Sequence, residues 1–162
     1  MPMKRYAWLT DIHLNFLSKD ELNVFLAMVR SESPDGVLIS GDIGESHNLL
    51  RYLRELERAW ELPIWFVLGN HDFYRSSAAA VRQAVAELCK GSSYLHWLPA
   101  EDVVELGFGT GLAGHDGWAD GRAGDYHNSE ILLNDYWLIS ELANLSPRER
   151  YSQLNAFGDE AA

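Results

Sequence analysis

Three short motifs of acids, histidines and glycines each follow directly after a short apolar segment of this chain. They are Thr10-Asp11-Ile12-His13, Gly41-Asp42-Ile43-Gly44-Glu45 and Gly69-Asn70-His71-Asp72. The apolar segments before them, 6–9, 37–39 and 64–68, are predicted to be buried strands, and helical patterns separate them. Because strands joined through helices run parallel, we expect the three motifs to meet at one edge of a sheet.

Capping signals place helices between and after the apolar segments. Ser18 and Glu21 form a capping box before one helix, and Ser46 is positioned to cap a second. An apolar stripe from Val81 to Leu88 marks a third helix after the last motif. This part of the chain therefore predicts a βαβαβα unit with a parallel sheet, an α/β fold.

The remainder of the chain has a different pattern. Three segments read as short strands that begin a second sheet: 94–98, 103–106 and 110–113. After a glycine-rich loop over 114–128, apolar spacing predicts a helix over 131–145, and a capping box at Ser146 starts a final helix. No linker rich in Pro or Ser divides the chain, so we expect residues 1–162 to form a single domain.

Charge and composition narrow the classes of function. The net charge is −11, so duplex nucleic acid and anionic membranes are poor partners by long-range electrostatics. No long apolar stretch follows the basic residues at the N-terminus, and no later segment is long enough to cross a bilayer. The lone Cys89 is expected to be a buried thiol in a reducing compartment. We therefore expect a cytoplasmic protein, whose oligomeric state the sequence leaves open.

The residue types in the three motifs are typical of a two-metal phosphoesterase site. A carboxylate with an imidazole, here Asp11 with His13, suits Mn, Fe or Zn better than Ca. Asp42 on the central loop is the natural bridge between two divalent ions, which in such sites lie roughly 3.5–4 Å apart. Asn70 offers a neutral carbonyl ligand. His71 beside it could stabilise the transferring phosphoryl oxygens or protonate the leaving group, so we predict a catalytic role for it.

Each motif taken alone has an ordinary structural interpretation. An Asp-x-His triplet carries little information, and Gly-Asp after a strand is commonly a turn. Glu45 has an adequate role as an acid in the first turn of its helix, and Asp72 is better explained by capping or support than by ligation. Gly41 and Gly69, however, fit backbones that turn sharply beside an ion, where a Cβ would obstruct. The ordered combination after three apolar strands favours the metal site.

The three motifs together resemble the opening motifs of the calcineurin-like metallophosphoesterases, which are Asp-x-His, Gly-Asp-x-x-Asp and Gly-Asn-His-Asp or Gly-Asn-His-Glu. The resemblance implies a four-layer α/β/β/α sandwich built around two sheets. It also implies that Asp11 and His13 bind the first metal, that Asp42 bridges, and that Asn70 binds the second metal. By the same resemblance His71 would assist catalysis.

Two departures from the family pattern stand in the sequence. Glu45 replaces the more frequent last Asp of the second motif. The family's later ligands, a lone histidine and then Gly-His-x-His, are absent, and Gly114-His115 matches only their first letters. We expect His115 to lie on the substrate side or to be structural. Two ions usually take about four to six ligands each, so we expect residues 1–162 to be the N-terminal part of a longer enzyme, with a domain that is truncated at its C-terminus.

Functions of different classes fit this pattern. The first is hydrolysis of phosphate mono- or diesters of a small substrate, by attack of a metal-bound hydroxide at a dinuclear centre. The second is a non-catalytic binding module that keeps the fold and holds at most one metal. A nuclease is disfavoured by the acidity, although a single-stranded or small nucleotide substrate stays open. Substrate specificity is expected to depend in part on the loop over 114–128.

Overall fold

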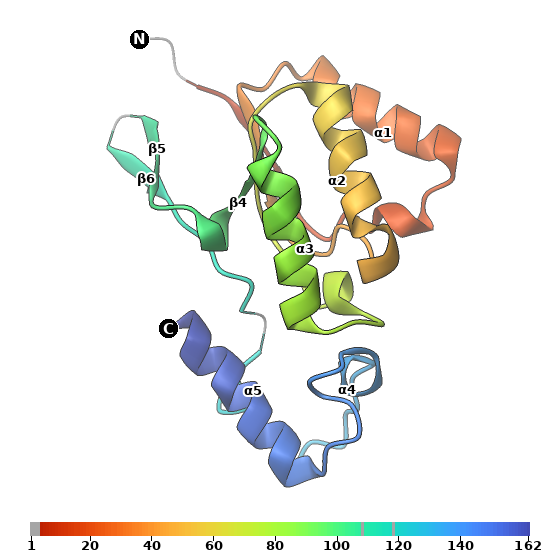
Figure 1. The fold of residues 1–162 in the computed structure, drawn as a ribbon, viewed down its shortest axis with the longest axis vertical. Coiled ribbons are helices and arrows are strands. Elements are labelled where there is room, and N and C mark those ends of the chain that lie inside the picture. Colours follow the sequence, from red (N-terminus) through yellow and green to blue (C-terminus); the bar gives the residue numbers. More distant parts are fainter. Residues whose placement is uncertain (1–3, 108, 118) are drawn as a thin grey trace.

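Four parallel strands form the central sheet of the chain, which we describe from a computed structural model over residues 4–107, 109–117 and 119–162 (Figure 1). The strands are β1 (Tyr6–Leu9), β2 (Gly36–Ser40), β3 (Ile64–Val67) and β4 (Leu95–Trp97), in the order β1-β2-β3-β4. The crossovers are made by α1 (Lys19–Ser31), α2 (Ser46–Trp60) and α3 (Ala78–Lys90), which lie together on one side of the sheet. The predicted parallel βαβαβα unit is confirmed.

The hydrophobic core lies between this sheet and the helices. Alternate residues of a strand point to the same face, and the buried residues of the two central strands alternate in this way: Val37, Ile39, Ile64 and Phe66. In α2 the fully buried residues recur at helical spacing: Leu49, Leu53 and Leu56. This packing fixes where each strand ends, and therefore where each motif begins.

The helix starts agree with the capping signals, with one shift. Ser18 accepts a hydrogen bond from the backbone N–H of Glu21 and caps α1 as predicted. Glu45, and not Ser46, is the N-cap residue of α2. The hydroxyl of Ser46 instead donates to the backbone carbonyl of Tyr74 at 2.6 Å. It therefore ties the start of α2 to the segment that follows the third motif.

The segment predicted to start a second sheet divides into two parts. Residues 94–98 do not join that sheet, because β4 pairs in parallel with β3 as the fourth strand of the first sheet. The crossover through α3 explains this, since it returns the chain to its starting edge. β5 (Val104–Gly107) and β6 (Thr110–Leu112) form a separate antiparallel pair. The hydroxyl of Tyr6 in β1 donates to the carbonyl of Leu106 in β5 at 3.2 Å.

The C-terminal part of the chain lies at one end of the sheet (Figure 1). It contains α4 (Asp135–Leu138) and α5 (Pro147–Ala161). The predicted helix over 131–145 is wrong in extent, because α4 has four residues. It ends where Ile139 takes an extended backbone and forms a parallel bridge with Ser76. Ile131, the first residue of the predicted helix, is 72% exposed. The predicted start of the last helix at Ser146 is confirmed.

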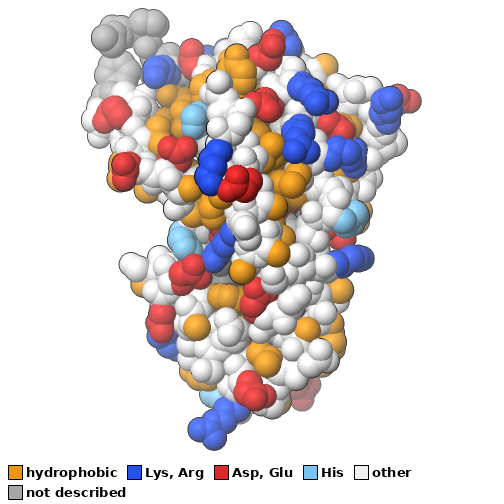
Figure 2. Space-filling view, viewed as in Figure 1, with side chains coloured by type: hydrophobic (Ala, Val, Ile, Leu, Met, Phe, Trp, Pro, Cys, Tyr) orange, Lys and Arg blue, Asp and Glu red, His pale blue; other side chains and the backbone are white. Residues whose placement is uncertain are grey.

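The surface shows a boundary between the sheet with its three helices and the C-terminal part of the chain (Figure 2). On the face shown in Figure 2 the molecule is hollowed between the part that holds the sheet and helices α1–α3 and the part that holds α5. Acidic and basic side chains are interspersed on this face. Within the described residues, no helix combines the length and apolar character needed to cross a bilayer.

Candidate metal centre

His13, Asp42 and His71 converge at the carboxyl edge of the sheet. Each offers a potential ligand atom, and these three atoms all lie within 4.8 Å of one another. The Nε2 of His13 is 3.7 Å from Oδ2 of Asp42, and the rings of His13 and His71 meet edge to face with centroids 4.7 Å apart. The three residues belong to the loops after β1, β2 and β3. The structure therefore brings together one member of each predicted motif.

Asp42 occupies the middle of this arrangement. Its side chain is nearly buried, and the residue is 8% exposed. Its backbone carbonyl accepts the N–H of His13 at 2.9 Å, and its Oδ1 accepts the backbone N–H of His71 at 3.0 Å. The second oxygen, Oδ2, is the one that faces the His13 ring. Asp42 thus contacts both neighbouring loops, and its bridging of two ions stays a prediction.

Three residues of the first two motifs have a strained backbone. Asp11, His13 and Asp42 have φ angles of 50°, 38° and 52°, which lie in the left-handed region. Each such residue costs roughly 1–3 kcal/mol and persists only where the surrounding structure holds it, which is common at functional sites. The hydrogen bonds from His13 and Leu14 to the carbonyls of Asp42 and Ile43, both 2.9 Å, provide that restraint.

The two motif glycines allow the loops to approach each other. Gly41 has a φ of 89°, and a Cβ there would lie 2.6 Å from the backbone nitrogen of Gly69. A Cβ at Gly69 would overlap Oδ1 of Asp42 and would lie 2.6 Å from the Asp42 nitrogen. The prediction that a side chain would obstruct the site at both positions is confirmed.

Gly69→Ala is expected to damage both the fold and the metal centre. The new methyl group must displace the Asp42 carboxylate or its backbone, and overpacking of this kind costs about 1–3 kcal/mol. Gly91→Ala is the matched control, because the nearest atom to a Cβ there is the Leu88 carbonyl oxygen at 3.7 Å. Urea denaturation and Mn²⁺ titration would compare the two variants. Equal stability and equal Mn²⁺ affinity in both would contradict the assigned role of Gly69.

The buried side chain of Asp72 links the second and third motifs through hydrogen bonds. It is fully buried, its Oδ1 accepts the backbone N–H groups of Ile43 and Gly44, and its Oδ2 accepts that of Gly69, each at 2.9 Å. Burial raises the pKa of the carboxyl to about 7, against the lowering effect of these three donors; the charge of Asp42 raises the pKa further. These bonds agree with the predicted supporting role.

Asn70 and His71 are held by residues that the sequence did not single out. The Nδ2 of Asn70 donates to Oδ1 of Asp135 at 2.7 Å and lies 3.4 Å from the hydroxyl of Tyr74. The rings of His71 and Tyr74 stack with centroids 4.3 Å apart. Burial and, next, the charge of Asp135 raise the pKa of Tyr74 to about 12. No motif marks Asp135, which comes from α4, far along the chain.

Two other acids of the motifs lie outside the group of three. Asp11 is exposed at the same edge, and its carboxylate accepts a hydrogen bond from the Thr10 hydroxyl. Its ligation of a metal stays a prediction. Glu45 caps α2 and pairs with Arg75 at 3.2 Å and His47 at 3.7 Å, which agrees with the structural role favoured by the sequence.

His115 is near this edge of the sheet but is not part of the group. It is half-buried, and its Nδ1 accepts the backbone N–H of Gly117 at 3.0 Å. The next residue, Asp116, is buried and accepts the N–H of Leu68 at the end of β3 at 2.8 Å, as well as an ion pair from Arg82 at 3.2 Å. The substrate-side role of His115 therefore stays a prediction.

The residues at the centre fit a divalent transition-metal ion. Two imidazoles with one carboxylate form a donor set that Mn, Fe or Zn accepts. Among the described residues none forms a hydrogen bond with the buried Nδ1 of His13, so this nitrogen is an unpartnered ring atom that an ion could take. The lack of a side chain at Gly69 leaves room for the Asp42 carboxylate of this donor set. His71, predicted as a catalytic residue, also lies within reach of such an ion.

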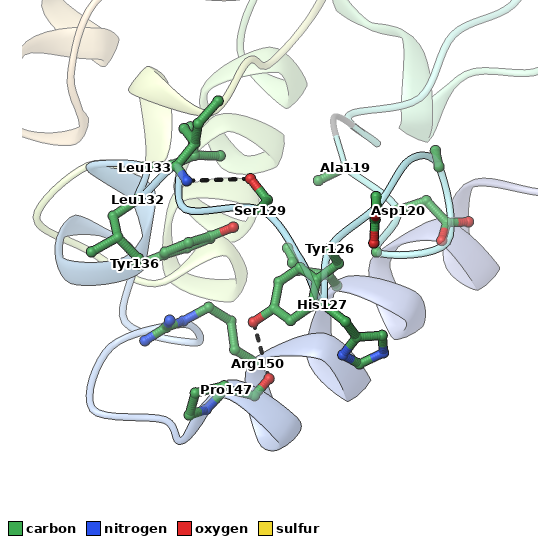
Figure 3. Close-up of a pocket in the computed structure, with 15 residues that line it drawn as sticks. Ala119, Asp120, Tyr126, His127, Ser129, Leu132, Leu133, Tyr136, Pro147 and Arg150 are labelled. Atoms are coloured by element: carbon green, nitrogen blue, oxygen red, sulfur yellow. Dashed lines mark hydrogen bonds between the residues drawn. The ribbon is translucent and has the colours of Figure 1, made fainter.

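A cavity of about 680 Å³ lies apart from this centre, in the C-terminal part of the chain (Figure 3). Its walls come from the loop over 119–133 and from α4 and α5, and the residues of the metal centre do not line it. Tyr136 is one wall, with the guanidinium of Arg150 over its ring at 4.3 Å from the centroid. Part of the loop over 114–128 therefore surrounds a cavity large enough for a small molecule.

Comparisons with known proteins agree with the geometry. A solved phosphopantetheinyl hydrolase from Mycobacterium tuberculosis is similar in fold, with a TM-score of 0.60 and 15% sequence identity. The match covers 96% of this chain and 62% of that hydrolase, so this chain spans less than two thirds of its length. The curated proteins include no significant sequence match. The pattern of the calcineurin-like phosphoesterases matches residues 4–158, and the chain therefore belongs to that family.

Proposed function

We propose that this chain carries the catalytic centre of a phosphoesterase. The centre would use two divalent ions to hydrolyse phosphate mono- or diesters of a small substrate. The observation that carries the proposal is the meeting of His13, Asp42 and His71 at the carboxyl edge of a parallel sheet. Ligands of such sheets bind beyond the carboxyl ends of the strands. Membership of the family supports the same reaction class.

The proposed roles follow the positions of the residues. Asp11 and His13 would hold one ion, Asn70 the other, and Asp42 would contact both. When bound, the ions would supply positive charge to the phosphoryl oxygens and a nucleophile derived from water. His71, whose ring lies beside His13 and stacks on Tyr74, would donate a proton to the departing alcohol oxygen.

Hydrolysis of p-nitrophenyl phosphate and of its bis ester by the Mn²⁺-loaded protein tests this proposal. We expect turnover with at least one of the two esters, and metal analysis is expected to give two ions per chain. Asn70→Ala is expected to remove most metal and activity. His71→Ala is expected to lower turnover by about 100-fold or more, the usual share of a general acid.

The binding module is the competing function, and the same measurements separate the two. A single bound ion without turnover would support the module, since three clustered side chains suffice for one ion. Turnover that is unchanged in both Asn70→Ala and His71→Ala would show that the ester is hydrolysed elsewhere, and the proposed centre would be wrong. Glu101→Ala, at an exposed position, is a control for the effect of substitution itself.

A further inference from the structure

We infer that Asp135 is a positioning residue for the metal centre. Its carboxylate binds the amide nitrogen of Asn70 and so leaves the amide oxygen of Asn70 available to a metal. The inference rests on the proposed function, in which Asn70 is a ligand. It adds a residue from the C-terminal part of the chain to a site that otherwise comes from the loops after β1, β2 and β3. No sequence motif contains it.

The argument begins with the chemistry of the amide. An Asn side chain has a donor end and an acceptor end, and only the oxygen can ligate a cation. A carboxylate accepts and never donates when ionised. The 2.7 Å contact between Asn70 Nδ2 and Asp135 Oδ1 therefore holds the nitrogen toward Asp135. The carbonyl end of Asn70 is then turned away from Asp135.

Asp135 is well placed to impose this orientation. The residue is 4% exposed, and a hydrogen bond to a buried charged acceptor is stronger than one between neutral groups. The hydroxyl of Tyr74, 3.4 Å from the same Nδ2, offers a weaker second partner. Without the carboxylate, the energy difference between the two amide orientations would fall. A larger share of the population would then present a nitrogen where the ligand oxygen is needed.

The helix that carries Asp135 is itself anchored. Tyr136, the next residue, is 7% exposed, and Arg150 of α5 lies over its ring at 4.3 Å from the centroid (Figure 3). The guanidinium also donates to the Leu145 carbonyl at 3.1 Å. Two adjacent buried residues of α4 thus connect the metal centre to the wall of the cavity. Trp137, which follows them, is 58% exposed and provides a control on the same helix.

The test measures Mn²⁺ affinity of the metal-free protein from the EPR signal of free Mn²⁺. Asp135→Leu is expected to weaken the affinity about 10- to 100-fold, the usual range for loss of a partner behind a metal ligand. Asp135→Asn keeps a neutral acceptor, so we expect a smaller loss, within about 10-fold. Trp137→Ala is expected to bind as the wild type does. Saturating Mn²⁺ is expected to restore most of the ester hydrolysis of Asp135→Asn, which a purely structural defect would not allow.

Wild-type affinity in Asp135→Leu, alongside a large loss in Asn70→Ala, would overturn the positioning role and leave the proposed function standing. Wild-type affinity in both would overturn the proposed function itself. Thermal melting of the metal-free variants checks their fold. If Asp135→Leu fails to fold, Asp135→Asn decides: native melting with weaker Mn²⁺ binding supports the inference, and wild-type binding contradicts it.

Discussion

Replacing Asp42 with alanine is expected to abolish ester hydrolysis and to weaken Mn²⁺ binding by more than about 100-fold. Loss of a group behind a ligand commonly costs 10–100-fold, and Asp42 is itself a candidate ligand for both ions. Its two carboxylate oxygens also contact the other two loops. Oδ1 lies 3.0 Å from the backbone nitrogen of His71, and Oδ2 lies 3.7 Å from Nε2 of His13. The substitution would therefore remove a candidate ligand and also the contacts that Asp42 makes with His13 and His71.

The measurement is Mn²⁺ titration of the metal-free variant followed by hydrolysis of p-nitrophenyl phosphate. Asp42→Asn is the informative companion, because the amide keeps the shape and one acceptor oxygen but removes the negative charge. We expect it to fold normally and to lose most of the metal affinity. Asp102→Ala, at an exposed position, controls for the loss of one acid from a chain of net charge −11. Near wild-type affinity in Asp42→Ala would exclude this residue as a ligand.

The N-terminal half of the fold could be predicted because local signals and global packing agree there. Apolar strands alternate with capped amphipathic helices, and a parallel sheet is the arrangement that buries both. The later segments gave weaker signals. A strand of three residues, Leu95–Trp97, cannot by its pattern show which sheet it joins. The predicted helix over 131–145 was wrong in extent because Ile139 forms a parallel β-bridge with Ser76. Sequence periodicity does not reveal such a long-range bridge.

The site followed the same division. The meeting of the three motifs at one edge of the sheet was predictable, because each motif follows directly after a strand of the parallel sheet. Asp135 and Tyr74 were not, since their contacts with Asn70 and His71 depend on tertiary packing. The glycine requirement at Gly69 was predictable as a need for space, and the structure identifies the Asp42 carboxylate as the group that occupies it.

Asp72→Ala is expected to lower the free energy of unfolding by about 3 kcal/mol, a large part of the 5–15 kcal/mol typical of a domain. The substitution leaves three backbone N–H groups, those of Ile43, Gly44 and Gly69, without their acceptor. Each buried group left unpaired costs about 1–3 kcal/mol. Burial raises the pKa of the Asp72 carboxyl to about 7, so alanine also removes an unfavourable buried charge, which keeps the expected loss near the lower end of the summed range.

Urea denaturation at neutral pH measures this loss, and Asp72→Asn separates its two causes. The asparagine can keep Oδ1 as the acceptor for Ile43 and Gly44, but it turns its own N–H groups toward the N–H of Gly69. We therefore expect a loss of about 1 kcal/mol, from the one donor left unpaired. Asp20→Ala, at an exposed position, is expected to change stability by less than about 0.5 kcal/mol. An Asp72→Ala protein as stable as Asp20→Ala would show that water or a shifted loop satisfies the three N–H groups. Asp72 would then not be what holds the second and third motifs together.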